Sequence, residues 1–509
     1  MRRWRNSGSL VLYSRGVMAT QPPTEFPPTD AADPGPSPQE SPSGSLDIPR
    51  PQPFFSVPGT TIFSVLVAAF IASVLVFSPA TRLDTLERPE EDLERLVSRE
   101  MDMRQVLQKA SAWERAVYRF LAGDEDSLDQ SIRWYEDLTR EIESPEAQLY
   151  RIMLLAEAGQ ADRISAAIVP WQYQGEGMVR MLDWVRAAYL KSPTAPATGQ
   201  RLISEVREEL SPGWFADTLV ARIANGIGDQ ATQAEAESAI ARRGTMFLNR
   251  QRALLIAEVG VLVWGGILVV PILRNSLRVP IGTTSLPPPW NFQDGYALFI
   301  RGVLGFLIIS GAATYLLPHP TALTAIISLL AGVPLFVWLA KYLAVRGLSL
   351  DALGLRLPAD FGRLARVTVV LVAVSLLGEI IITVMVALFH IKTDWTDGLL
   401  EDLLWDPPWA VLSSAVDSIV WAPLVEEVAF RGVLYGTLRT KMGVGPAALL
   451  SAAIFAFVHG YGAIGLASVF WSGLIWALAY ERTGSLWPAT LAHGVNNLMV
   501  TGEFVWMYR

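Results

Sequence analysis

Two adjacent glutamates and an arginine stand inside an apolar stretch of this chain, which runs from about Val411 to Gly436. Ionisable side chains at membrane depth are costly unless they are paired or hydrated, so such residues usually line a working cavity. On an α-helix, Glu427 and Arg431 lie one turn apart in the favoured order for an ion pair. Glu426 lies about 100° round the helix and has no cation within its own turn. Glu426 is thus the candidate general base, and the alternative is that both glutamates are structural.

Two later apolar stretches each carry a histidine. Phe455 and His459 lie in one of them, and His493 and Asn497 lie in the last one. Because His493 and Asn497 are four residues apart, they share one face of a helix. A lone histidine on an apolar face is more often a core residue than a catalyst, but packing alone does not explain three helices that each carry inward polar groups. The three stretches together predict a shared polar site.

In this order on hydrophobic helices, Glu-Glu-x-x-x-Arg, Phe-x-x-x-His and His-x-x-x-Asn resemble the three signatures of the CPBP intramembrane protease family, also called the ABI or CAAX-protease-like family. That family includes the eukaryotic CAAX prenyl endopeptidase. Leu353-Gly354-Leu355-Arg356 resembles a common lead-in, and the similarity covers about residues 340–505. The resemblance implies a glutamate-type peptide hydrolase in which the first glutamate of the pair is catalytic.

Hydrolysis of a peptide bond needs an activated water, a base that takes its proton and donors for the developing oxyanion. A carboxylate among apolar helices is suited to take that proton and to pass it to the leaving amine. We assign this role to Glu426, with His459 holding and polarising the water. His493 and Asn497 are expected to donate to the oxyanion. The supporting residues are expected to be Glu427, Arg431 and Phe455.

Two alternatives keep the same residues. In the first, Glu426, His459 and His493 are ligands of a catalytic zinc ion, since two histidines and a glutamate form a known zinc set. The compact His-Glu-x-x-His motif is absent, so we favour a site without a metal or another cofactor. In the second, the protein is a non-catalytic membrane scaffold that binds a partner. The complete motifs argue against this alternative.

Composition places the chain in the membrane. Of its 509 residues, 51% are hydrophobic and only 18% are charged, and the mean hydropathy is +0.32. These values indicate several bilayer spans in an all-α polytopic membrane protein. The net charge of −8 argues against nucleic acid as a partner. The chain has no cysteine, which excludes disulfides, thiolate nucleophiles and cysteine-bound zinc.

The N-terminal half has three parts. Residues 1–53 are rich in proline and serine and predict a disordered tail, in which either Met1 or Met18 can be the start. Residues 60–78 are uncharged and long enough for a first transmembrane helix. Residues 83–248, called the extramembrane segment below, are charged and helical in period. They predict a soluble all-α domain, and glycines in turn-like positions at 122–124, 158–160 and 228–230 fit a helical-repeat domain.

Eight or nine transmembrane helices are predicted in all, with further helices at 253–345 and a CPBP-type core at 346–505. The Pro287-Pro288-Pro289 run separates the second and third spans. His319 is expected in an exposed turn, and His390 at the end of a span. The predicted spans are about 60–78, 253–273, 295–317, 322–345, 365–390, 411–437, 446–463, 465–480 and 485–505.

Charges near the spans predict the orientation. An alternating path through nine spans puts nine basic residues on or beside loops of one side, which should be cytoplasmic. These residues are Arg274, Arg278, Lys341, Arg346, Arg356, Arg363, Arg366, Arg439 and Lys441. The extramembrane segment then lies outside, as in a bacterial inner membrane. We expect it to recruit substrate, to sense a signal or to bind a protein partner, and we expect the substrate to be a membrane-embedded or lipid-anchored protein or peptide.

Overall fold

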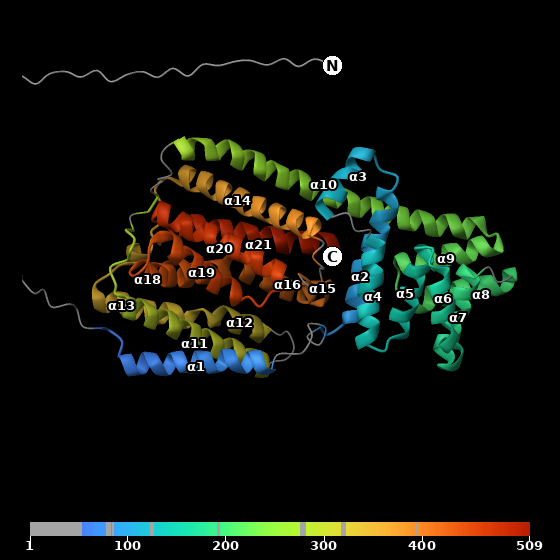
Figure 1. Ribbon diagram of the computed structural model, residues 1–509, viewed down its shortest axis with the longest axis horizontal. Coiled ribbons are helices and arrows are strands. Elements are labelled where there is room, and N and C mark those ends of the chain that lie inside the picture. The colour runs from blue at the N-terminus through green and yellow to red at the C-terminus, as the bar shows by residue number, and fades with distance from the viewer. Residues whose placement is uncertain are drawn as a thin grey trace, which may run out of the picture. The chain divides into compact units, whose positions relative to one another are not determined.

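The described part of the chain contains helices and no strand, so the predicted all-α class is confirmed (Figure 1). The predicted tail, His319 and His390 lie outside the described residues, apart from Pro53. From Pro53 to Arg509 the chain forms one compact unit. The computed structural model describes residues 53–77, 83, 86–122, 127–190, 194–274, 281–282, 284–316, 322–389, 391, 394–396 and 398–509.

Short amphipathic helices build the extramembrane segment around an apolar core of its own. At its centre the rings of Tyr135, Tyr150 and Phe215 contact one another, and none of them is more than 3% exposed. Gly159 and Gly228 adopt positive φ in the turns that follow two of these helices, as their predicted turn positions require. The helices are α2 (Pro89–Leu107), α3 (Ala112–Ala122), α4 (Ser127–Glu141), α5 (Pro145–Glu157), α6 (Ala161–Ala167), α7 (Glu176–Tyr189), α8 (Pro196–Glu209) and α9 (Trp214–Ile227), with a 3₁₀ turn at Val169–Tyr173.

A single long helix joins this segment to the membrane-type helices. It is α10 (Gln230–Arg274), with 45 residues. Its first half is charged and packs against α2 and α9, and its second half is apolar and packs against α14 (Phe361–Leu388). The extramembrane segment is therefore joined through α10 to the apolar stretch that packs against α14, without an intervening loop.

A helix lies at each of the nine predicted spans. Within the described residues, six helices are long and apolar enough to cross a membrane, and the apolar parts of α1 and α19 are shorter. The six are Gln230–Ile272, Phe292–Ala313, Ile326–Arg346, Phe361–Leu388, Pro408–Arg439 and Ala463–Thr483. The membrane-type helices not yet named are α1 (Val57–Phe77), α11 (Phe292–Leu316), α12 (Ala322–Ala331), α13 (Val333–Arg346), α16 (Pro408–Val416), α17 (Ala422–Glu426), α18 (Gly436–Arg439), α19 (Val444–Phe457), α20 (Ala463–Thr483) and α21 (Trp487–Tyr508).

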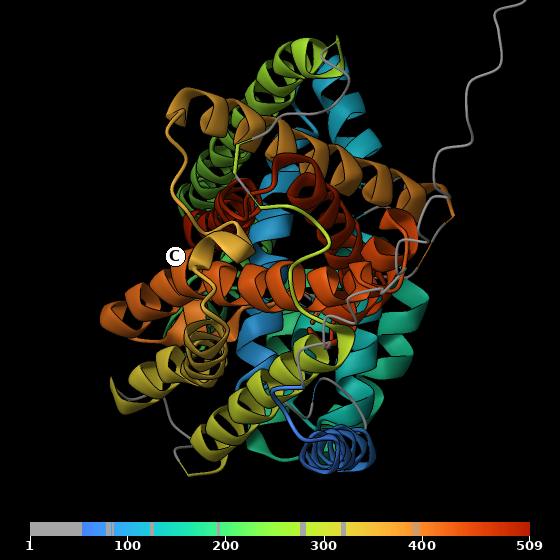
Figure 2. The ribbon, with the colours of Figure 1, turned by 90° about the vertical axis from the view of Figure 1, so that its left-hand side faces the viewer.

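The first helix lies at the edge of the group, beside α11, as Figure 2 shows with α1 seen end on. Asp294 fixes its start, because this fully buried carboxylate accepts a hydrogen bond of 2.9 Å from the Phe54 N–H. The same carboxylate pairs with Arg346 at 3.0 Å. α1 is thus a peripheral addition to the helices that carry the predicted motifs.

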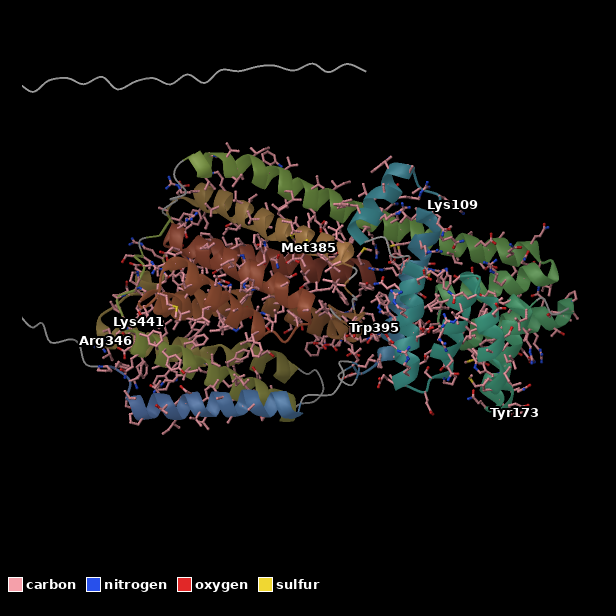
Figure 3. The ribbon with its side chains drawn as sticks, viewed as in Figure 1. Lys109, Tyr173, Arg346, Met385, Trp395 and Lys441 are labelled. Atoms are coloured by element: carbon pink, nitrogen blue, oxygen red, sulfur yellow. The ribbon has the colours of Figure 1, made fainter. Side chains whose placement is uncertain are left out.

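Charged and aromatic side chains mark the two ends of the membrane-type helices. Arg346 and Lys441 lie at one end, and Trp395 lies at the end that faces the extramembrane segment (Figure 3). Trp395 is 5% exposed and belongs to the apolar core of that segment. The basic end of the helices is therefore the end far from the extramembrane segment.

Candidate active site

The helix that carries the two glutamates is not a regular α-helix. It runs from Pro408 to Arg439 and contains π-helical stretches at Asp417–Trp421 and Glu427–Tyr435. Such wide turns are frequent at functional sites, and they change the direction of side chains along one helix. The sequence analysis assumed α-helical spacing throughout. The Glu427 to Arg431 pair forms all the same, since a separation of four residues stays within reach in both kinds of turn.

Glu427 and Arg431 form a fully buried ion pair. Their side chains are 0% and 1% exposed, and Arg431 Nη1 lies 3.0 Å from Glu427 Oε1. Arg431 also donates through Nη2 to the Gly473 carbonyl at 3.2 Å. Its guanidinium lies over the ring of Phe455 at 4.1 Å from the centroid. Burial of one charge without the other would be strongly unfavourable, so the pair and its neighbours fix the helix here.

Glu427 also holds His493. The Nδ1 atom of His493 lies 3.0 Å from Glu427 Oε1, and the ring of His493 stacks on Trp476 with centroids 4.2 Å apart. A nitrogen at this distance from a carboxylate oxygen carries the hydrogen. The Nε2 atom of His493 therefore points the other way with a free lone pair when the ring is neutral.

Glu426 lies between the two predicted histidines. Its Oε2 atom is 3.8 Å from Nε2 of His459 and 3.8 Å from Nε2 of His493. His459 Nδ1 lies 2.6 Å from the Phe455 carbonyl oxygen, which only an N–H can approach so closely. Both rings thus turn Nε2 toward the same carboxylate oxygen. Glu426 and His493 lie on helices, whereas His459 lies in the turn that directly follows α19, because α19 ends at Phe457 and does not continue to the end of the predicted span 446–463. The three side chains nevertheless converge on one point.

The spacing around Glu426 suits one water molecule. A separation of 3.8 Å is too long for a direct hydrogen bond. Glu426 Oε2 has no hydrogen-bond partner among the described residues, although it is buried. The side chains of Glu426 and His459 are 28% and 21% exposed, so water reaches them, whereas His493 is 5% exposed. A water between these atoms can give its protons to the carboxylate and to an imidazole nitrogen.

Asn497 makes a different contact from the predicted one. Its Nδ2 atom donates to the Ser418 carbonyl at 2.7 Å, within the first π-helical stretch. No hydrogen bond joins Asn497 to Glu426, His459 or His493 in the described part of the chain. The amide therefore ties α21 to the helix of Glu426, and its role as an oxyanion donor stays a prediction.

Three residues of the site were missed by the sequence analysis. Trp476 lies on α20, outside every motif, and stacks on His493. Gly473 and Gly494 allow close approach, since a Cβ on Gly473 would lie 3.2 Å from Arg431 Nη2 and one on Gly494 would lie 2.6 Å from the Ile419 carbonyl oxygen. Gly494 stands inside the third motif, and this was the one available signal. Trp476 and Gly473 carry no sequence signal of their own.

The site fits zinc in donor type but not in spacing. One carboxylate and two imidazoles form a known zinc set, and the hydrogen bonds on the far nitrogens are typical of zinc-bound histidines. Ligands of one tetrahedral zinc ion lie about 3.3 Å apart, since the bonds are about 2.0–2.1 Å long. Here Glu426 Oε2 is 3.8 Å from both nitrogens. The described residues hold no group of three or more such side chains arranged for a metal ion. No catalytic step is therefore derived through a metal.

The motif helices match a known family. Residues 407–499 match the family model described as Type II CAAX prenyl endopeptidase Rce1-like. This match confirms the resemblance to the CPBP or CAAX-protease-like family. It begins just before α16 and ends within α21, so it includes Glu426, His459 and His493. Neither the curated proteins nor the solved structures give a match.

Proposed function

We propose that the domain at residues 407–499, which matches the Type II CAAX prenyl endopeptidase Rce1-like family model, hydrolyses a peptide bond with a water activated by Glu426. The convergence of Glu426, His459 and His493 carries the proposal. These side chains come from two helices and from the turn after a third, and both imidazoles present Nε2 to one carboxylate oxygen. Core packing alone does not produce this arrangement.

The proposed reaction begins at Glu426. Its carboxylate takes a proton from the water that His459 orients, and the hydroxide attacks the carbonyl carbon of the scissile bond. Glu426 then passes the proton to the nitrogen of the leaving amine as the C–N bond breaks. His493 stabilises the oxyanion through Nε2 when its ring carries both protons, and Asn497 is the second proposed donor.

Charge balance supports Glu426 as the acceptor of the proton. The two glutamates and Arg431 together carry one net negative charge among apolar helices. One proton, on Glu426 or on His493, removes that net charge. Glu427 is less suited to this role, because its side chain is fully buried and its Oε1 atom already contacts Arg431 and His493.

The proposed substrate is a membrane-embedded or lipid-anchored protein or peptide. The name of the matched family refers to prenylated substrates. The proposed substrate class covers prenylated and other membrane-associated proteins alike. We further propose that the extramembrane segment lies on the non-cytoplasmic side of a bacterial inner membrane. The position of Arg346 and Lys441 at the opposite end of the helices supports this side.

Terminal-peptide mass spectrometry of membranes tests the activity. Cells that contain the wild-type protein are compared with cells that contain Glu426→Gln at equal abundance. We expect new protein ends, within or close to a span, in the wild type only. Identical ends in both samples would show that Glu426 is not the base.

A further inference from the structure

The extramembrane segment contacts the two catalytic helices at their near ends. The first contact is made by α15 (Glu401–Trp405), which directly precedes the helix of Glu426. The second is made by the last residues of α21, the helix of His493. The matched family domain begins at residue 407 and ends at residue 499, so both contact points lie outside it.

Glu401 is bonded to the start of α2. Its carboxylate accepts hydrogen bonds from the backbone N–H groups of Glu87 and Arg88, at 2.9 Å each to Oε1. These groups lie just before Pro89, the first residue of α2. A carboxylate at this position also interacts favourably with the positive end of the helix dipole.

Trp405 makes the second bond between α15 and α2. Its indole Nε1 donates to Asp92 Oδ1 at 2.7 Å, and the guanidinium of Arg95 lies over its ring at 4.2 Å from the centroid. Asp406 and Pro407 follow, and α16 begins at Pro408. Because two consecutive prolines restrict the backbone, the start of α16 follows the position of α15 closely.

The end of α21 is held in the same way. Arg99 of α2 lies over the ring of Tyr508 at 4.1 Å, and Arg250 of α10 donates to the Trp506 carbonyl at 2.7 Å. Arg509 then joins the two contact points, because its guanidinium donates to the carbonyls of Leu403 and Asp406 at 3.0 and 2.6 Å. The near ends of both catalytic helices thus share one set of bonds to α2 and α10.

We propose that Glu401 and Trp405 are positioning residues through which the extramembrane segment sets the spacing between Glu426 and His493. This inference rests on the proposed function and adds a mode of regulation to it. A protein or peptide that binds the extramembrane segment and shifts α2 changes the alignment of the catalytic residues without touching them. The segment therefore acts as a sensor that is connected to the active site.

Helix geometry makes this coupling effective. Glu426 lies 18 residues after Pro408, and His493 lies 15 residues before Tyr508, which correspond to about 27 and 23 Å of helix. Both helices are straight connections from the contact points to the site, except for the π-helical stretches. A displacement of about 1 Å at a catalytic group is enough to slow a reaction by up to about 100-fold.

Two substitutions at Trp405 distinguish the contribution of its hydrogen bond from that of its aromatic ring. Trp405→Phe keeps an aromatic ring under Arg95 and removes the N–H that bonds to Asp92. Trp405→Ala removes both. We expect kcat for a validated peptide in proteoliposomes to fall about tenfold in Trp405→Ala and less in Trp405→Phe, with KM unchanged within about twofold. Asp92→Asn retains an acceptor for the indole and should keep the wild-type kcat and KM.

A spectroscopic distance gives a readout that does not need activity. The chain has no cysteine, so two introduced cysteines are the only labelling sites. Leu412 on α16 and Val500 on α21 are suitable, since they are 66% and 55% exposed. Nitroxides at these positions report the separation of the catalytic helices by pulsed electron paramagnetic resonance. We expect the distance distribution to shift or broaden in Trp405→Ala and in Glu401→Ala.

Arg222→Gln is the matched control. It breaks an ion pair with Glu157 inside the extramembrane segment, far from α15 in sequence. We expect an unchanged distance distribution and unchanged kcat. The inference is overturned if Trp405→Phe and Glu401→Ala, folded by circular dichroism, both keep the wild-type distribution. It is also overturned if kcat falls in them without a change in distance. A wild type without proteolytic activity would refute the proposed function, while the distance measurement would still decide the coupling.

Discussion

The buried pair of Glu427 with Arg431 and the surface pair of Glu157 with Arg222 use the same chemistry in opposite surroundings. The surface pair has the better geometry, with two bonds of 2.9 and 2.6 Å. The buried pair has one contact of 3.0 Å, yet its side chains are 0–1% exposed, against 18% and 49% at the surface. Water screens the surface pair and leaves the buried one unscreened. The burial of each ion pair, more than the distance between its charged atoms, therefore determines how much the pair contributes to stability.

The same contrast separates Glu426 from its neighbour Glu427. Both are glutamates on one helix, but Glu427 is fully buried and contacts Arg431 and His493 through Oε1, whereas Glu426 is 28% exposed and lies 3.8 Å from two imidazole nitrogens. One carboxylate therefore stabilises the fold, and the other is available for chemistry. The predictions below test this division of roles.

The largest effect is expected from Glu426→Gln. This change removes the base but keeps the shape of the side chain, so proteolysis should fall by about 100-fold to 10,000-fold. The protein should still insert and fold, as judged by yield and by its elution in detergent. Full turnover of a validated substrate by Glu426→Gln would contradict the assignment of the base.

A smaller effect, on stability instead of chemistry, is expected from Arg431→Ala. Removal of one partner leaves Glu427 buried and uncompensated, which should cost about 3–5 kcal/mol of the free energy of unfolding. Glu427→Gln should also lower the folded yield. Arg222→Ala is the matched surface variant and should cost about 0.2–1 kcal/mol. Denaturant titration in detergent measures the difference, and equal losses for both arginines would remove the contrast between the two pairs.

The pH dependence of stability offers a finer test at the contact with α15. The pKa of Asp92 is raised to about 6, chiefly by burial; the hydrogen bond from Trp405 lowers this pKa in part, and the nearby Glu401 adds to the rise. Because the ionised form is disfavoured in the folded protein, stability is greatest below the unfolded pKa of Asp and is lost as the pH rises through about 6.

Asp92→Asn removes this titration and keeps the acceptor for Trp405. The variant should have a higher melting temperature than the wild type at about pH 7.5, and the gain should shrink as the pH falls through 6 toward about 4. The charged neighbours Glu91 and Glu401 are present in both proteins, so the difference reports Asp92 alone. A constant difference across this range would show that Asp92 does not titrate near 6.

Local pairings could be predicted from the sequence, and long-range ones could not. Glu427 and Arg431 are four residues apart, so the helix period alone places them together. The prediction that His459 and His493 converge on Glu426 rested on the order of the motifs, because residue spacing alone does not determine how three segments pack. The π-helical stretches were missed because the sequence analysis assumed one period throughout.

The contacts at α15 show the same limit more clearly. Glu401 and Glu87 are more than three hundred residues apart, and neither lies in a motif. In the sequence, Glu401 is one of several acidic residues between two predicted spans, and nothing there indicates the helix start that it contacts. Trp405 and Asp92 are likewise joined only by the folded chain. The catalytic residues were thus easier to predict than the residues that hold their helices.

The smallest expected effect is that of metal removal. The carboxylate and both imidazoles are supplied by the chain, and their separations of 3.8 Å suit a water better than a shared metal ligand sphere. We therefore expect activity to survive exhaustive chelation, with no stoichiometric metal in the purified protein. His459→Ala is the useful companion, because it should lower activity in either case but should change metal content only if a metal is bound. Elemental analysis could instead find one zinc ion per chain that is lost, together with activity, in His459→Ala. That result would mean that the attacking water is bound to zinc and that Glu426 is a zinc ligand instead of the base.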